Sequence, residues 1–114
     1  MPSVPFLKAF ADAWNRHDIE DLMGCMTDDC VFVTSSGTRF EGMAAVREAF
    51  ESVFEAFPDA RWGNDTHFVS GDRGVSEWVF TGTDAEDQTS VEEQGCYIFT
   101  FRDGKIFLKD TYLK

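Results

Sequence analysis

The chain of 114 residues has the length of one domain, so we expect a single domain over residues 1–114. Its formal net charge of −11 argues against nucleic-acid binding and against anionic membrane surfaces, because both require a basic surface. Twelve Phe and three Trp provide enough apolar material for a core, which a disordered chain would lack.

The first third of the chain predicts two helices and a strand. Ser3 caps a helix whose apolar residues recur every four positions, and the segment NRHD interrupts it. Asp18 then caps a second helix, which Gly24 weakens and shortens. The β-branched and aromatic stretch CVFVT, residues 30–34, predicts the first strand, and SSGTRFEG after it reads as a loop.

A longer helix from Gly42 to about Phe57 follows, and Pro58 ends it. The period then changes to two, and turn signals such as Asp103-Gly104 separate four strands. The expected strands are residues 61–69, 74–83, 91–102 and 105–113. This order predicts an α+β fold with three N-terminal helices packed on a curved, mainly antiparallel sheet.

Alternation along the strands separates an inner face of the sheet from an outer face. The inner sets are Glu93, Gly95, Tyr97, Phe99 and Phe101, then Phe107, Lys109, Thr111 and Leu113, and then Ser76, Trp78 and Phe80. We expect His67 and Glu77 on the outer face, where they would pair across strands.

Cysteines and histidines are too few and too scattered for a disulfide framework or a zinc site. The N-terminal residues lack the pattern of a signal peptide, and no apolar stretch is long enough to span a membrane. We therefore expect a cytoplasmic protein without a metal.

Four stretches resemble the SnoaL-like branch of the nuclear transport factor 2-like proteins: FADAWNRHDIEDLMGCMTDDCVF, FEGMAAVREAF, GVSEWVFTGT and GCYIFTFRDGKI. The resemblance covers nearly the whole chain. It implies a cone-shaped α+β fold in which the inner face of the sheet lines a pocket. Because members include polyketide cyclases, ketosteroid isomerases, epoxide hydrolases, dehydratases and binding domains, the function has to be argued from the pocket residues.

At three positions where isomerases and cyclases of this family carry an acid or a phenol, this chain departs from the pattern. Thr34 stands in place of an aspartate base, Phe10 in place of a tyrosine, and Tyr97 in place of an aspartate. The resemblance therefore disfavours ketosteroid isomerase chemistry and casts doubt on proton transfer by an aspartate.

Tyr97 and Lys109 are the leading catalytic candidates, because both face inward on neighbouring strands. A pair of this kind could polarise a carbonyl group, with Glu93 as a base. In the alternative interpretation Tyr97 fills the core, Lys109 extends to the rim, and Glu93 and His17 have no catalytic role. The residues expected to contact a ligand are Phe10, Trp14, Thr34, Phe54, Trp78, Phe99 and Thr111.

Three hypotheses about function follow. The first is an enzyme of the isomerase or cyclase type that acts on a small hydrophobic molecule without a cofactor. The second is a non-catalytic module that binds such a molecule. The third is a homodimer formed through the outer face of the sheet, where Cys96, Ile98 and Leu108 would otherwise meet water; it is compatible with either of the others.

Overall fold

A computed structural model describes residues 2–114 as three helices and six strands. The helices are α1 (Val4–Arg16), α2 (Ile19–Gly24) and α3 (Met43–Ala56). The strands are β1 (Met26–Val33), β2 (Arg39–Glu41), β3 (Arg61–Ser70), β4 (Arg73–Thr83), β5 (Ser90–Arg102) and β6 (Lys105–Leu113).

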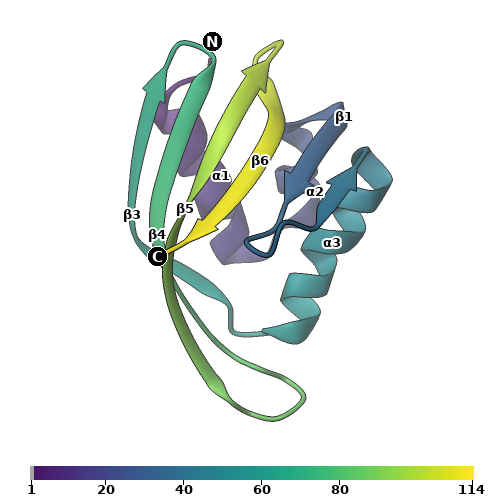
Figure 1. Ribbon diagram of the computed structural model, residues 1–114, viewed down its shortest axis with the longest axis vertical. Helices are drawn as coiled ribbons and strands as arrows, with labels where there is room; N and C mark the ends of the chain where they lie inside the picture. Colours follow the sequence, from purple (N-terminus) through teal and green to yellow (C-terminus); the bar gives the residue numbers. More distant parts are fainter. Residues whose placement is uncertain (1) are drawn as a thin grey trace.

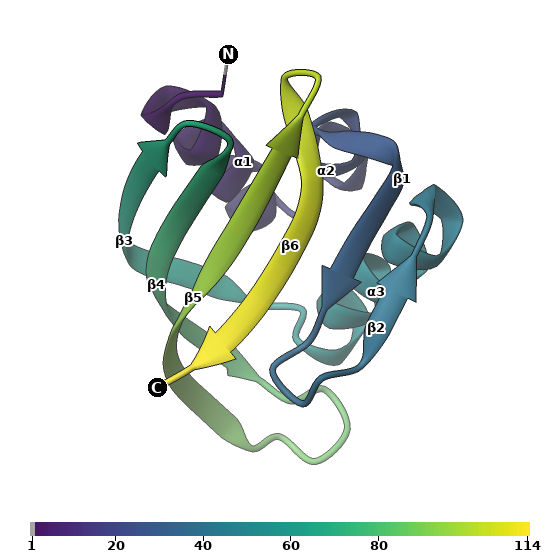
Figure 2. The same ribbon diagram turned by 45° about the horizontal axis from the view of Figure 1, so that its top comes forward.

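The six strands form one curved sheet in the order β2-β1-β6-β5-β4-β3, and the helices cover one face of it (Figure 1). Neighbouring strands are antiparallel except for β1 and β6, which are parallel. Figure 2 shows the curvature, with α1 crossing behind β3–β5 and α3 lying behind β1 and β2. The predicted α+β fold with a curved, mainly antiparallel sheet is confirmed.

The helix boundaries follow local signals in the sequence. The Ser3 side chain accepts a hydrogen bond from the Phe6 N–H at 3.3 Å, and Asp18 accepts one from the Asp21 N–H at 3.1 Å. These caps satisfy backbone donors that a helix start leaves without partners. Both predicted caps are therefore confirmed.

The helix α2 has only six residues and ends at Gly24, as expected, so two of the three helices are long. The first strands differ from the prediction in two ways. Strand β1 begins at Met26, four residues earlier than expected. Residues 39–41, expected in a loop, form the short strand β2 beside β1, so α3 follows a first hairpin.

Two register shifts turn side chains to faces that simple alternation does not predict. Between Gly63 and Thr66 the pairing of β3 with β4 shifts, and Asn64 there has a positive φ of 50°. His67 consequently points inward, so its predicted outer position is wrong. A second shift between β5 and β6 buries Ile106, which we had not expected inside, in place of Phe107.

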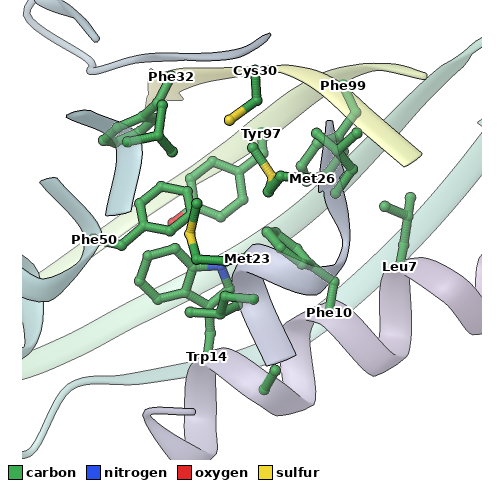
Figure 3. Packing of buried hydrophobic residues seen from close by; sticks show 14 of the residues in the cluster. Leu7, Phe10, Trp14, Met23, Met26, Cys30, Phe32, Phe50, Tyr97 and Phe99 are labelled. Carbon is green, nitrogen blue, oxygen red and sulfur yellow. The ribbon is translucent and has the colours of Figure 1, made fainter. Parts of the chain in front are cut away.

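The space between the helices and the sheet is filled mainly by aromatic side chains (Figure 3). Phe10, Phe50 and Phe99 are at most 2% exposed. Trp14 lies among them, with its ring centroid 4.7 Å from that of Phe50 and 6.3 Å from that of Phe10. Within residues 2–114, no helix is long and apolar enough to cross a membrane.

Candidate functional site

A narrow cavity lies between α1 and the inner face of β3, β4 and β5. Its volume of about 10 Å³ is close to the minimum that holds one water molecule. Its walls are Leu7, Phe10, Ala11, Trp14, Trp62, Asp65, His67, Ser76, Trp78, Tyr97 and Phe99. Ligand pockets usually measure several hundred Å³, so this space is too small in the structure for the small hydrophobic molecule that the sequence led us to expect.

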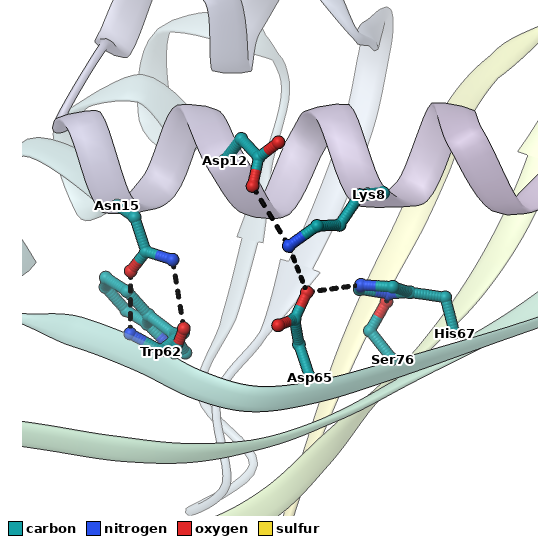
Figure 4. A network of polar contacts seen from close by, with 7 residues as sticks. All are labelled: Lys8, Asp12, Asn15, Trp62, Asp65, His67 and Ser76. Atoms are coloured by element: carbon teal, nitrogen blue, oxygen red, sulfur yellow. Dashed lines mark hydrogen bonds and ion pairs between the residues drawn. The ribbon is translucent and has the colours of Figure 1, made fainter.

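Three polar side chains in the cavity wall form a continuous array (Figure 4). His67 Nδ1 lies 2.7 Å from Ser76 Oγ, and His67 Nε2 lies 2.7 Å from Asp65 Oδ2. On the outer side, Lys8 Nζ donates to the same Asp65 oxygen at 3.0 Å and also lies 3.2 Å from Asp12. The array therefore runs from the cavity to the surface of α1.

The charges in this array fix the direction of its hydrogen bonds. Burial alone would raise the pKa of Asp65, but the hydrogen bonds from His67 and Lys8 outweigh burial and lower it. Asp65 is therefore a carboxylate near neutral pH and accepts the Nε2–H of His67. Nδ1 then carries the lone pair that accepts the Ser76 O–H, a tautomer assigned from these partners. The geometry is that of an acid–histidine–hydroxyl relay.

Sequence reasoning missed two members of this array, since Asp65 was not considered and His67 was expected outside. The signal that could have found them is Gly63-Asn64 inside a strand pattern, because both residue types are frequent at β-bulges and at positive φ. One extra residue there reverses the face of each side chain that follows. Ser76, expected inside, is buried on β4 as predicted.

Tyr97 and Lys109 lie together in the core, as their positions on neighbouring strands predicted. Lys109 Nζ is 3.5 Å from the centroid of the Tyr97 ring, and the Tyr97 hydroxyl accepts a hydrogen bond from Trp62 Nε1 at 2.9 Å. The ammonium group thus meets the face of the ring and not its hydroxyl. Three further rings, those of Phe32, Trp14 and Phe50, lie 4.3–5.2 Å from Nζ.

Burial shifts both titrations toward the neutral side chain. It lowers the pKa of Lys109 well below its ordinary value. It also raises the pKa of Tyr97, against a smaller opposite effect of the hydrogen bond from Trp62. Among residues 2–114, no carboxylate lies within 4 Å of the Lys109 amine. The surroundings therefore disfavour an ammonium–phenolate pair.

The other predicted site residues fall into two groups. Phe10, Trp14, Trp78 and Phe99 line the cavity, whereas Glu93 is exposed on β5 and lies outside its wall. The Thr34 hydroxyl bonds to Ser36 in the turn after β1.

Two predicted residues beside the cavity have other surroundings. Phe54 stacks on His17 at 4.3 Å between ring centroids, and His17 Nε2 lies 2.9 Å from the Ala60 carbonyl oxygen. The contacts of His17 fit the non-catalytic interpretation. Thr111 is paired with Tyr97 across the strands, and its hydroxyl has no partner.

Two tryptophans that line the cavity have buried donors without acceptors. The indole N–H groups of Trp14 and Trp78 are buried without a hydrogen-bond partner. Buried polar groups usually have one, so each such group calls for an explanation. A ligand with a carbonyl or hydroxyl oxygen could supply the acceptor. Within residues 2–114, no cluster of three or more His, Cys, Asp or Glu side chains could hold a metal ion.

Comparison with known proteins agrees with this architecture. The sequence profile of the SnoaL-like domain matches residues 7–108. The chain belongs to the SnoaL-like domain family. A search of curated proteins finds no match to this SnoaL-like chain.

Solved structures share the fold of this SnoaL-like chain at low sequence identity. A candidate polyketide cyclase from Pseudomonas putida has a TM-score of 0.90 and 18% identity, over 100% of this chain and 92% of that one. Another candidate polyketide cyclase, from Xanthomonas campestris, has a TM-score of 0.85 and 21% identity, over 95% of this chain and 87% of that one. A cystatin-fold protein from Novosphingobium aromaticivorans has a TM-score of 0.86 and 19% identity, over 97% of both chains. At these identities the likeness concerns the fold.

Proposed function

We propose that this SnoaL-like protein binds a small, ring-containing carbonyl compound between α1 and the sheet and transfers a proton on it without a cofactor. The observation that carries the proposal is the array of Asp65, His67 and Ser76 at the cavity, with 2.7 Å between successive partners. The fold shared with candidate polyketide cyclases supports a substrate of this class.

Each member of the array has a defined part in the proposed reaction. Asp65 holds His67 in the tautomer that leaves Nδ1 free to accept a proton. The Ser76 hydroxyl, which donates to Nδ1, passes the substrate proton to it. The indole N–H groups of Trp14 and Trp78 would stabilise the oxygen of the resulting enolate. The array takes over the base function that the family aspartates supply elsewhere.

Tyr97 and Lys109 support this site from behind in the proposal. The Tyr97 ring forms part of the cavity wall, and Lys109 packs against the face of that ring away from water. Tyr97 remains a candidate donor to the substrate carbonyl, whereas Lys109 fixes the position of the ring. Glu93 has no part in the proposed reaction because of its exposure.

Proton exchange with solvent tests this function directly. In D₂O, the protein should exchange the α-protons of a cyclic aryl ketone, followed by NMR over a panel of such ketones. His67→Gln should lower the exchange rate by a factor of about 100 or more, the scale of general base catalysis. His17→Gln is the matched control and should exchange at the wild-type rate. Equal rates in wild type and His67→Gln would contradict the proposal.

A non-catalytic binding module is the second candidate. The absence of the family's aspartates at Thr34 and Tyr97, and of its tyrosine at Phe10, favours it. The module would release a bound ring compound unchanged. Binding detected by calorimetry, together with no exchange and no product, would decide for this candidate.

We also propose that two copies pair through the outer face of the sheet. Phe68, Val75 and Ile98 face each other across β3, β4 and β5, and Phe68 is 55% exposed. Ile98→Asp should place a charge in that interface and convert a dimer into a monomer in sedimentation at micromolar concentration. Val4→Asp changes an exposed apolar residue on α1 and should leave the dimer intact. A monomeric wild type would contradict this proposal.

A further inference from the structure

We propose that Ser76 is a nucleophile and that the same cavity hydrolyses small aromatic esters through an acyl-Ser76 intermediate. This activity rests on the site of the proposed function but requires a covalent step that proton transfer does not. Serine nucleophiles are recognised by geometry: a hydroxyl bonded to a histidine that a carboxylate orients.

The array meets this description at each contact. Both hydrogen bonds of His67 are 2.7 Å long, one to the hydroxyl of Ser76 and one to the carboxylate of Asp65. The His67 side chain is 4% exposed and Ser76 is 5% exposed, so water competes little with either bond. Lys8 neutralises the outer side of Asp65, which keeps the carboxylate ionised and in place.

The ring nitrogens have the tautomer that this chemistry needs. Because Asp65 accepts the Nε2–H, Nδ1 can take the Ser76 proton as Oγ forms a bond to the acyl carbon. The ester C–O bond then breaks, and the leaving alcohol takes that proton from Nδ1. Water attacks the acyl-Ser76 carbon, with His67 again taking and returning a proton. One ester and one water give one acid and one alcohol, and no oxidant or reductant is involved.

The two tryptophans in the cavity wall supply donors for the negative oxygen that forms during attack. The indole N–H groups of Trp14 and Trp78 are buried and unpartnered, and Trp78 lies two residues from Ser76 on the same face of β4. Donors that are already dry and fixed before the reaction stabilise a developing oxyanion most effectively. Their lack of an acceptor in the free protein fits this part.

The walls of the site limit the ester to a compact aromatic one. The cavity of about 10 Å³ must widen to admit a ring, and α1 forms one of its walls. A few polar contacts hold α1 to β3 along the seam beside the cavity. These contacts are the Lys8–Asp65 bond and the side chain of Asn15, which bonds to the backbone N–H and C=O of Trp62 at 2.8 and 2.9 Å. A surface groove along this seam shares Trp62 and Asp65 with the cavity.

Phenylmethanesulfonyl fluoride is the probe of choice, because its benzyl group is small and its sulfur takes a serine oxygen with loss of fluoride. Intact mass and peptide mapping should find one adduct, on Ser76. Ser76→Ala should give no adduct, and His67→Gln should form it at least tenfold more slowly. Ser70→Ala, an exposed serine at the end of β3, is the matched control and should react like wild type. The thermal stability of each variant is measured alongside, so that a folding defect is distinguished from the loss of the nucleophile.

The same samples are assayed with 4-nitrophenyl acetate, where acylation of Ser76 should release a burst of about one nitrophenol per chain. The assignment of Ser76 as a nucleophile would be overturned by the absence of an adduct, by an adduct on another residue, or by an unchanged rate of adduct formation in His67→Gln. Ketone exchange without an adduct would overturn only the nucleophile. An adduct at Ser76 without exchange would support the nucleophile and overturn only the proton-transfer function.

Discussion

Lys109→Met should make the folded chain more stable at pH 7, by about 1–4 kcal/mol, the range found when a buried ion pair is replaced by apolar side chains. Lys109 is 1% exposed, and methionine matches its length without an amine to desolvate. The stability would be measured by urea unfolding of both proteins at the same pH.

Two opposing effects decide this result. A ring face attracts a desolvated ammonium by about 2 kcal/mol, and the Tyr97 ring is the nearest of the four around Nζ. Burying an ammonium costs several kcal/mol, and aromatic faces replace only part of its hydration. No carboxylate within 4 Å compensates among residues 2–114, so burial should prevail.

The pH dependence of stability independently indicates whether Lys109 stabilises or destabilises the folded chain. The pKa of Lys109 is lowered by burial in the folded chain, while in the unfolded chain it keeps the ordinary value of 10.5. Between these values the unfolded chain binds more protons, so the stability of the wild type rises with pH and the gain is complete above 10.5. The advantage of Lys109→Met should therefore be largest at low pH and shrink toward pH 10.5.

Lys105→Met is the matched control, because Lys105 is exposed on the same strand. Its stability should follow that of the wild type at each pH. If Lys109→Met is instead less stable than the wild type at every pH, then the aromatic rings hold a protonated lysine and the expected balance is wrong.

The fold could be predicted because its signals are periodic and repeated. The caps at Ser3 and Asp18, the change of period after Pro58 and the turn at Asp103-Gly104 each define a boundary by local chemistry. The short strand β2 was missed because three residues carry no period, and its pairing with β1 depends on contacts outside the segment.

The candidate site was only partly predictable, because it depends on irregularities. Tyr97 and Lys109 were placed together correctly, since both strands keep a regular alternation at those residues. His67 was misplaced because a single extra residue at Asn64 changes the face of the strand, and alternation counts residues without detecting a bulge. The exposure of Glu93 was one of the alternatives left open by the sequence.

The polar side chains of this site stand at other positions in the chain than those that the family resemblance implies. Phe10, Thr34 and Tyr97 lack the carboxylates and phenol of the acid-bearing members, whereas Asp65, His67 and Ser76 bring a carboxylate, an imidazole and a hydroxyl to β3 and β4. Asp65, His67 and Ser76 line the cavity, whereas Thr34 lies in the turn after β1. In the proposed function the proton-transfer groups therefore come from β3 and β4.

Gly95→Ala should destabilise the folded chain by about 1–3 kcal/mol, the usual cost of forcing extra atoms into a packed interior. A Cβ on Gly95 would lie 2.4 Å from the Tyr112 carbonyl oxygen and 2.9 Å from the Trp78 ring. The carbonyl belongs to the backbone of β6, which pairs with β5 at this point, so it cannot move away without disturbing the ladder. Trp78 would have to shift as well, and it forms part of the cavity wall.

Gly63→Ala separates this steric effect from the general effect of replacing glycine in a strand. A Cβ on Gly63 meets nothing closer than 4.0 Å. The free energy of unfolding of this variant in urea should therefore differ from that of the wild type by no more than about 0.5 kcal/mol. Because Trp78 must move in Gly95→Ala, the near-ultraviolet circular dichroism of this variant should also differ from that of the wild type. Adduct formation at Ser76 should be slower in the same variant. Equal stability of the two variants would mean that β5 and β6 can separate at Gly95, and that the position of Trp78 does not depend on the missing side chain.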